Sequence, residues 1–191
     1  MSISPLSTRD QKPHLRLVGA SAAAEVDEDS LEFSAVFRRY GRYVASIGAK
    51  ILGGAEDELD DLVQEVFLEA YRGLSEVREP RAVRGWLARI CVRRATRRLK
   101  RRRLRAWFSL DKVDDARLPP MTGANPERSA QARAAYRVLE RMDAEERAVW
   151  VLRHLEDESL DDIAAICACS KSTVQRRLRT AQARFEKEAG K

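Results

Sequence analysis

Apolar residues recur at the spacing of amphipathic helices over much of the first half of the chain. Between residues 33 and 51, and again between residues 59 and 74, they follow a period close to 3.6. Gly53 and Gly54 separate the two stretches, and glycine is a common residue where a helix ends. The apolar positions are Phe33, Val36, Phe37, Tyr40, Val44, Ile47 and Ile51, then Leu59, Leu62, Val63, Val66, Phe67, Ala70 and Leu74. The pattern therefore predicts two amphipathic helices.

A third helix is predicted after Pro80, from about Val83 into an arginine-rich stretch, with Trp86 and Cys91 expected in the core. Residues 109–126 lack any period and contain Pro119, Pro120 and three aspartates, which is typical of a linker. Residues 1–30 mix Ser, Pro, Ala and acidic residues, and we interpret them as a disordered N-terminal tail.

Helical signals resume after the linker. One helix is expected over residues 127–141, and Asp143 with Glu146 has the spacing of a capping box at the start of another. Ser159 and Asp162 repeat this spacing before a short helix, and a last helix reaches about residue 188. No strand pattern appears. We predict an all-α chain of two small helical domains, residues 31–108 and 127–188, joined by a flexible linker.

Charge is strongly partitioned along the chain, whose formal net charge is +6. Residues 31–79 hold ten acidic and six basic residues, whereas residues 81–105 hold twelve basic residues and no acidic one. Residues 143–162 are again acidic, and residues 171–184 carry five cations and no acid. Two separate basic blocks favour a polyanionic partner, of which nucleic acid is the most common.

The strongest local signal is a helix-turn-helix over residues 160–185. Val174, Leu178, Ala181 and Phe185 are spaced as its buried stripe, although an ordinary solvated basic helix would show a similar stripe. On the other face lie side chains that can bond base edges in a major groove, with further cations beside them for phosphates. The candidate DNA-binding residues are Lys171, Ser172, Thr173, Gln175, Arg176, Arg177, Arg179 and Arg184.

Several classes of protein are disfavoured. No apolar run approaches the ~18–20 residues that span a bilayer, so no membrane insertion is expected. Three cysteines do not make a disulfide framework and fit a reducing, cytoplasmic compartment. Cys167, Cys169 and His154 offer only three potential metal ligands, and we interpret them as structural. No catalytic spacing or phosphate loop occurs, so we expect no enzyme, no metal and no cofactor.

The chain resembles bacterial RNA polymerase sigma factors of the sigma-70 family. The run DLVQEVFL at residues 61–68 is similar to their region 2.2, and WLARI at residues 86–90 resembles the start of region 2.4. Residues 139–185 are similar to region 4, including LDDIA at 160–164 and STVQRRL at 172–178. The resemblance covers about residues 31–107 and 127–188. The sequence lacks the third domain that lies between these regions in other members, and in this it resembles the extracytoplasmic-function (ECF) subfamily.

The resemblance implies a subunit that brings core RNA polymerase, through its clamp and flap regions, to promoter DNA. Residues 31–108 would bind the clamp and read and melt the −10 element, and residues 127–188 would read the −35 element. The implied polymerase-binding residues are Asp61, Gln64, Glu65 and Leu68. The implied −10 contacts are Arg78, Arg81, Arg84, Arg89, Arg93 and Arg97. An anti-sigma factor is a further candidate partner.

Two other functions remain open on the residues alone. One is a helix-turn-helix transcriptional regulator that binds DNA without polymerase. The other is a helical adaptor whose basic faces bind acidic protein surfaces. Only a sigma factor would make initiation by core polymerase depend on this chain.

Overall fold

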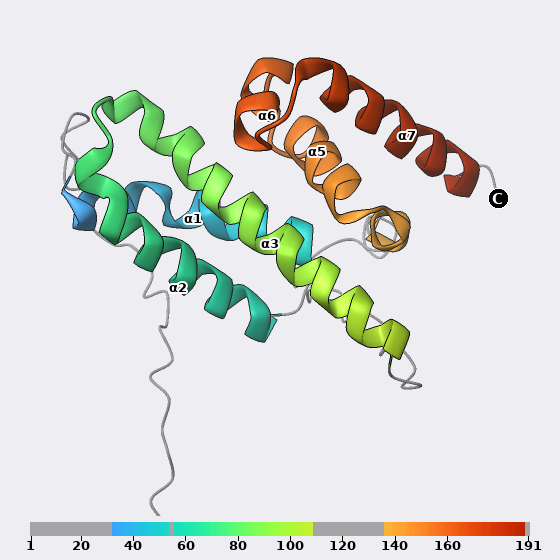
Figure 1. Cartoon of the computed structure of the whole chain (residues 1–191), viewed down its shortest axis with the longest axis horizontal. Helices are drawn as coiled ribbons and strands as arrows, with labels where there is room; N and C mark the ends of the chain where they lie inside the picture. The colour runs from blue at the N-terminus through green and yellow to red at the C-terminus, as the bar shows by residue number, and fades with distance from the viewer. Residues whose placement is uncertain (1–31, 54–55, 109–135, 190–191) are drawn as a thin grey trace, which may run out of the picture.

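The computed structural model describes residues 32–53, 56–108 and 136–189, and these residues form helices and short connections without a strand. Three helices make up the first half: α1 (Phe33–Leu52), α2 (Glu56–Gly73) and α3 (Val83–Phe108). Short 3-10 turns at Leu74–Glu76 and Pro80–Ala82 connect α2 to α3. The second half holds a helical segment at residues 136–141, then α5 (Ala144–His154), α6 (Leu160–Ile166) and α7 (Lys171–Ala189) (Figure 1).

The helix boundaries follow the local chemistry that the sequence indicates. Gly53 ends α1 in the left-handed conformation, with a φ of 78°, and its N–H donates to the Ala49 carbonyl. The capping box at Asp143 is present, since the Glu146 carboxylate accepts the Asp143 N–H at 3.4 Å. The predicted tail and the linker at 109–126 lie outside the described residues, as does most of the helix expected over 127–141.

The predicted apolar faces of α1, α2 and α3 form the core of the first half. Val44, Ile47, Leu62, Val66 and Leu87 are fully buried there. Cys91 is also fully buried, and Trp86 is partly buried against this core, as the sequence predicts. The first half is therefore a three-helix bundle in which α3, at 26 residues, is the longest element.

The two halves pack against each other, which the pattern of apolar residues does not indicate. Helices α5 and α6 contact α3, and α5 also contacts α1, so one cluster of buried apolar residues spans both halves. Figure 1 shows α5 and α6 beside α1 and α3, with α7 on the outer side. The apolar residues that join the halves, such as Val151 and Leu152, belong to the general helical stripe of α5, so periodicity alone did not single them out.

Candidate nucleic-acid and polymerase interface

The helix-turn-helix forms as predicted, from α6, a four-residue connection and α7. The Ser159 hydroxyl accepts the Asp162 N–H at 3.1 Å, and the Ser170 hydroxyl accepts the Thr173 N–H at 3.2 Å, so each helix has a side-chain cap. Ala168 in the turn adopts a φ of 49°, a conformation that glycine adopts more easily. Ala168 therefore reverses the chain between α6 and α7 in a backbone conformation that costs a modest amount of free energy.

Helix α7 presents a buried stripe and an exposed polar face. Val174 and Ala181 are fully buried, and the Phe185 ring stacks on Trp150 with 5.2 Å between ring centroids. On the opposite face Gln175, Arg176 and Arg179 are exposed and make no side-chain hydrogen bond or ion pair within the described part of the chain. Exposed Ser172 shares this face. The donors of Gln175, Arg176 and Arg179 are therefore free to bond base edges in a major groove, whereas the Ser172 hydroxyl shares a hydrogen bond of 2.9 Å with the Ser170 hydroxyl.

The cations beside this face are instead bonded to other residues of the second half of the chain. Lys171 pairs with Asp161 at 2.9 Å, and Arg177 donates to the Cys169 sulfur at 3.8 Å. Arg184 pairs with Glu146 at 3.3 Å and donates to the Arg141 carbonyl at 3.2 Å. Thr173 is partly buried at the helix cap. The predicted −35 residues thus fall into two groups. Gln175, Arg176 and Arg179 form a central row of unbonded side chains, and the flanking residues are bonded to other residues of the second half.

The predicted −10 residues lie along the α2–α3 connection and along α3 as far as Arg97. Four of them are exposed and make no side-chain bond to other described residues: Arg78, Arg81, Arg89 and Arg97. The other two are already paired with carboxylates. Arg84 pairs with Glu158 at 2.6 Å, and Arg93 pairs with Glu69 on α2.

The predicted polymerase-binding residues share the outer face of α2. Asp61 and Gln64 are exposed, and Leu68, an apolar side chain, is 51% exposed. Glu65 is different, because its carboxylate accepts from Arg94 at 2.8 Å and from Arg98 at 2.9 Å. Glu65 therefore joins α2 to α3, a role that the sequence pattern did not indicate.

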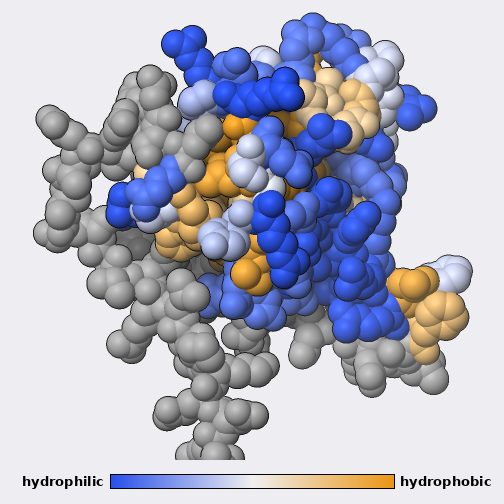
Figure 2. All heavy atoms as spheres, turned by 60° about the vertical axis from the view of Figure 1, so that its left-hand side comes forward, coloured by the Kyte–Doolittle hydropathy of each residue, from blue (hydrophilic) through white to orange (hydrophobic). Residues whose placement is uncertain are grey.

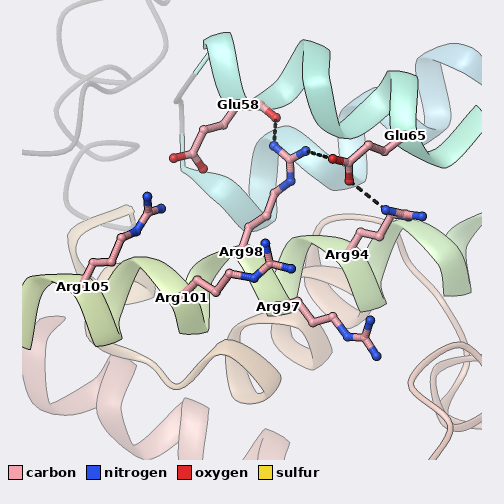
Figure 3. A pocket seen from close by; sticks show the side chains of 7 residues that line it. All are labelled: Glu58, Glu65, Arg94, Arg97, Arg98, Arg101 and Arg105. Atoms are coloured by element: carbon pink, nitrogen blue, oxygen red, sulfur yellow. Dashed lines mark hydrogen bonds and ion pairs between the residues drawn. The ribbon is translucent and has the colours of Figure 1, made fainter.

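A basic groove runs between α2 and the second half of α3, with a volume of about 280 Å³. Figure 3 shows Arg94 and Arg98 turned toward Glu65, while Arg97, Arg101 and Arg105 project from α3 without a bond to the residues drawn. Its lining residues are Glu58, Glu65, Arg94, Arg97, Arg98, Arg101 and Arg105. Hydrophilic side chains also cover most of the right-hand surface in Figure 2. Five of the seven residues that line the groove are arginines, so the groove is positively charged and suits a polyanion.

The cysteines and His154 do not form a cation site. Burial raises the pKa of the Cys91 thiol to about 12, and burial, with Cys169 nearby, raises that of Cys167 to about 12. Thiols with such pKa values are protonated at neutral pH and are poor nucleophiles. His154 packs on the Trp150 ring at 4.8 Å between centroids. No group of three metal-binding side chains occurs among the described residues, and none of their helices could span a bilayer.

Comparison with known proteins identifies the two halves separately. Residues 36–116 match the family model of Sigma-70 region 2, and residues 132–184 match that of Sigma-70, region 4. The ECF RNA polymerase sigma factor SigM of Mycobacterium tuberculosis is 30% identical over 180 residues, covering 93% of this chain and 87% of SigM. The ECF RNA polymerase sigma-E factor of Escherichia coli is 31% identical over 159 residues, covering 78% and 82% of the two chains.

Solved structures share the fold. The sigma factor RpoE of Bartonella quintana, in complex with the anti-sigma factor NepR, matches with a TM-score of 0.65 at 19% identity, over 83% of this chain and 96% of RpoE. CnrH, in complex with the cytosolic domain of CnrY, matches with a TM-score of 0.57 at 25% identity, over 81% and 84%. With both sigma regions in order and relatives aligned over most of their length, the chain belongs to the ECF family of RNA polymerase sigma factors.

Proposed function

We propose that this sigma factor, which directs promoter-specific transcription initiation by core RNA polymerase, reads the −35 element with the outer face of α7. Ser172, Gln175, Arg176 and Arg179 would contact bases, and Lys171, Thr173, Arg177 and Arg184 would approach phosphates. One observation carries the proposal: Gln175, Arg176 and Arg179 stand exposed in a row with no bond to any described residue. Arg bonds guanine and Gln bonds adenine bidentately, so this row suits direct readout.

The −10 element would be read by the α2–α3 connection and by α3 as far as Arg97. Arg78, Arg81, Arg89 and Arg97 are available as they stand. Arg84 and Arg93 could join them only by exchanging a carboxylate partner for DNA. An arginine leaves a carboxylate at little cost if it forms a new ion pair with another anion. A DNA phosphate is such an anion.

The clamp of core polymerase would bind the outer face of α2. Asp61, Gln64 and Leu68 are the exposed candidates, and Glu65 would contribute while still held by Arg94 and Arg98. An exposed leucine among polar groups is typical of the apolar centre of a protein interface. The flap is proposed to bind the second half, and an anti-sigma factor, as found bound to RpoE, is a further proposed partner.

We further propose functional units at residues 31–108 and 127–188, connected by a linker at 109–126. Eighteen extended residues reach ~60 Å at ~3.3–3.6 Å each, about the length of 18 base pairs. Simultaneous contact with both elements is therefore within reach of the chain. No catalytic centre or cofactor is proposed, and the protein would act in the cytoplasm with polymerase.

Promoter binding with and without core polymerase tests this function against the alternative of an independent regulator. A gel shift on a duplex containing both elements should show tight, specific binding only when core polymerase is present. A single helix-turn-helix contacts too little DNA for tight binding alone. Tight sequence-specific binding by the chain without polymerase would favour the regulator instead.

A further inference from the structure

The basic groove between α2 and α3 holds more positive charge than its own carboxylates balance. Five arginines and two glutamates line it, which gives a net charge of +3. Three of these residues, which we call the free arginines, are exposed and make no side-chain bond to described residues: Arg97, Arg101 and Arg105. Guanidiniums that share one wall of a groove repel one another, so an anion bound between them is favoured.

The other two arginines hold the groove in shape. The Glu65 carboxylate on α2 accepts from Arg94 at 2.8 Å and from Arg98 at 2.9 Å. Arg98 also donates to the backbone carbonyl of Glu58 at 2.9 Å. These bonds join α2 to α3 on the side of α3 from which the free arginines project (Figure 3). The walls of the groove are therefore fixed before any ligand binds, which lowers the entropic cost of binding.

The spacing of the free arginines suits a ligand with several linked anionic groups. They follow one another along α3 at intervals of four residues, each of which spans ~6 Å of helix. Long side chains at this spacing can converge on neighbouring groups of one extended ligand. Guanidiniums bond phosphate oxygens in a bidentate fashion, and each linked phosphate carries at least one negative charge. A chain of three phosphates therefore matches both the number of free arginines and the net charge of the groove.

The size of the groove favours a small molecule over a DNA duplex. Its volume is about 280 Å³, just below the ~300–1,000 Å³ of most sites for small ligands. The axes of packed helices lie ~8–10 Å apart, so a duplex is too wide to enter between α2 and α3. The groove therefore suits the phosphates of a small molecule whose remaining part lies outside it.

An exposed aromatic ring lies next to the groove along α3. Phe108 follows Arg101 by seven residues and is therefore on the same side of the helix, two turns further on. Its side chain is 79% exposed. Exposed aromatic rings beside cations are stacking surfaces for nucleobases. Seven residues of helix span ~10 Å, a distance that the ribose and first phosphates of a nucleotide can bridge.

We propose that the basic groove binds a nucleoside polyphosphate, with the phosphates on the free arginines and the base on Phe108. The site itself does not depend on the proposed function. Its consequence for transcription does, because Arg97 is one of the proposed −10 contacts. A bound polyphosphate would occupy Arg97 in place of DNA and thereby lower the affinity of the chain for the −10 element.

Calorimetric titration of the full-length chain with ATP tests the site. Arg101→Gln combined with Arg105→Gln should weaken ATP binding about tenfold, because two charge-assisted hydrogen-bonding groups are lost. Arg38→Gln combined with Arg42→Gln is the matched control and should leave ATP binding unchanged. These two arginines have the same spacing on α1, are exposed and make no side-chain bond to described residues. Circular dichroism checks that each variant keeps its helicity.

Two single substitutions separate the parts of the ligand. Phe108→Ala should weaken ATP binding about fivefold, through lost stacking, and leave the binding of inorganic tripolyphosphate unchanged. Glu58→Gln should strengthen the binding of both, because the Glu58 carboxylate lines the groove and makes no bond to described residues. Glu76→Gln removes the same charge from an exposed position outside the groove and should change neither.

Saturable binding of one ATP to each chain, weakened by the groove substitutions alone, is the result we expect. Absence of saturable binding, or equal weakening by the α1 control, would overturn the site. If the Arg101 and Arg105 double variant does not fold, unchanged affinity in Glu58→Gln would overturn it equally.

Two further outcomes distinguish the source of the phosphates. Equal affinity for ATP and tripolyphosphate, with no effect of Phe108→Ala, would assign the groove to an inorganic polyphosphate and overturn the nucleoside. Tighter binding of a single-stranded oligothymidylate than of ATP, lost in the Arg101 and Arg105 double variant, would overturn the small ligand in favour of a nucleic-acid strand. The titration contains no polymerase and no promoter, so failure of the chain to support initiation would reject the proposed function without affecting this result.

Discussion

The guanidinium of Arg147, on α5, donates to the backbone carbonyl of Lys50, near the end of α1, at 3.1 Å. Arg147 is 1% exposed, and burial, with Arg102 nearby, lowers the pKa of its guanidinium to about 10. A cation at a helix C-terminus is favoured by the helix dipole. This contact therefore places a charged residue of the second half against the end of α1.

Gly53 is expected to be required where Arg147 and α1 meet. Its φ is +78°, and a Cβ there would lie 2.6 Å from the Arg147 Nη2. Gly53→Ala should lower the free energy of unfolding by about 1–2 kcal/mol from the left-handed backbone alone. Gly41→Ala is the control, since an added Cβ there meets nothing within 4 Å and a helix interior favours alanine by about 0.5–1 kcal/mol. Equal urea midpoints for the two variants would contradict the assignment.

Leu68 is expected to bind core polymerase through its exposed apolar side chain. Leu68→Ala should weaken the affinity for core polymerase about fivefold, because truncating an apolar residue at the centre of an interface costs about 1 kcal/mol where that residue contributes to binding. Leu104 on α3 is a matched control, at 57% exposed against 51% for Leu68. Titration of core polymerase with labelled chain measures both. The assignment fails if Leu104→Ala weakens binding as much as Leu68→Ala does.

Arg176 is expected to specify bases at the −35 element, whereas Arg184 is expected to attract phosphate. Arg176→Ala should cost about 1–3 kcal/mol on the preferred sequence and reduce discrimination at one or two base pairs. Arg184→Ala should weaken every −35 variant by the same factor, because Arg184 is tethered to Glu146 away from the central row. Promoter affinity of the polymerase complex across single-base variants separates the two. The reverse pattern would show that the recognition face is misplaced.

Glu69 connects α2 to α3 through Arg93 and Arg94. Burial alone would raise the pKa of the Glu69 carboxyl, but the two guanidiniums outweigh it and hold that pKa below 4.5. A folded-state pKa below the unfolded one stabilises the protein above about pH 4.5, and this stabilisation is lost as the pH falls. Glu69→Gln should therefore reduce the loss of stability on acidification, by about 0.2–1 kcal/mol.

Urea midpoints between pH 3 and pH 7 measure this effect of Glu69. Glu76→Gln serves as the control, because Glu76 is exposed and makes no ion pair with the described residues. If Glu76→Gln and Glu69→Gln change the pH dependence equally, the ion pairs of Glu69 do not contribute to stability.

The helices and their caps could be predicted from the sequence because they depend on local chemistry. Ile47 and Leu62 followed the helical period, Gly53 ended a helix, and Ser159 had a capping partner three residues later. The candidate reading face of α7 was predictable for the same reason, since i, i+3 and i+4 positions share a face in any helix.

Contacts between distant segments could not be predicted in this way. In the sequence Glu158 is one of the acidic residues of the stretch 143–162, and nothing there indicates that its partner is Tyr43, 115 residues away. The ion pairs of Arg84 and Arg93, which the sequence predicts as −10 contacts, could not be foreseen either, because Glu158 lies in the α5–α6 connection and Glu69 on α2. Periodicity reports which face of a helix is buried, but it does not report what that face meets.

Run-off transcription with purified core polymerase tests the central claim most directly. The template carries a −10 and a −35 element, and matched templates carry either element mutated. We predict full-length transcript only when wild-type chain is added, and loss of transcript when either element is mutated. Initiation that is independent of the chain, or unchanged on both mutated templates, would contradict it.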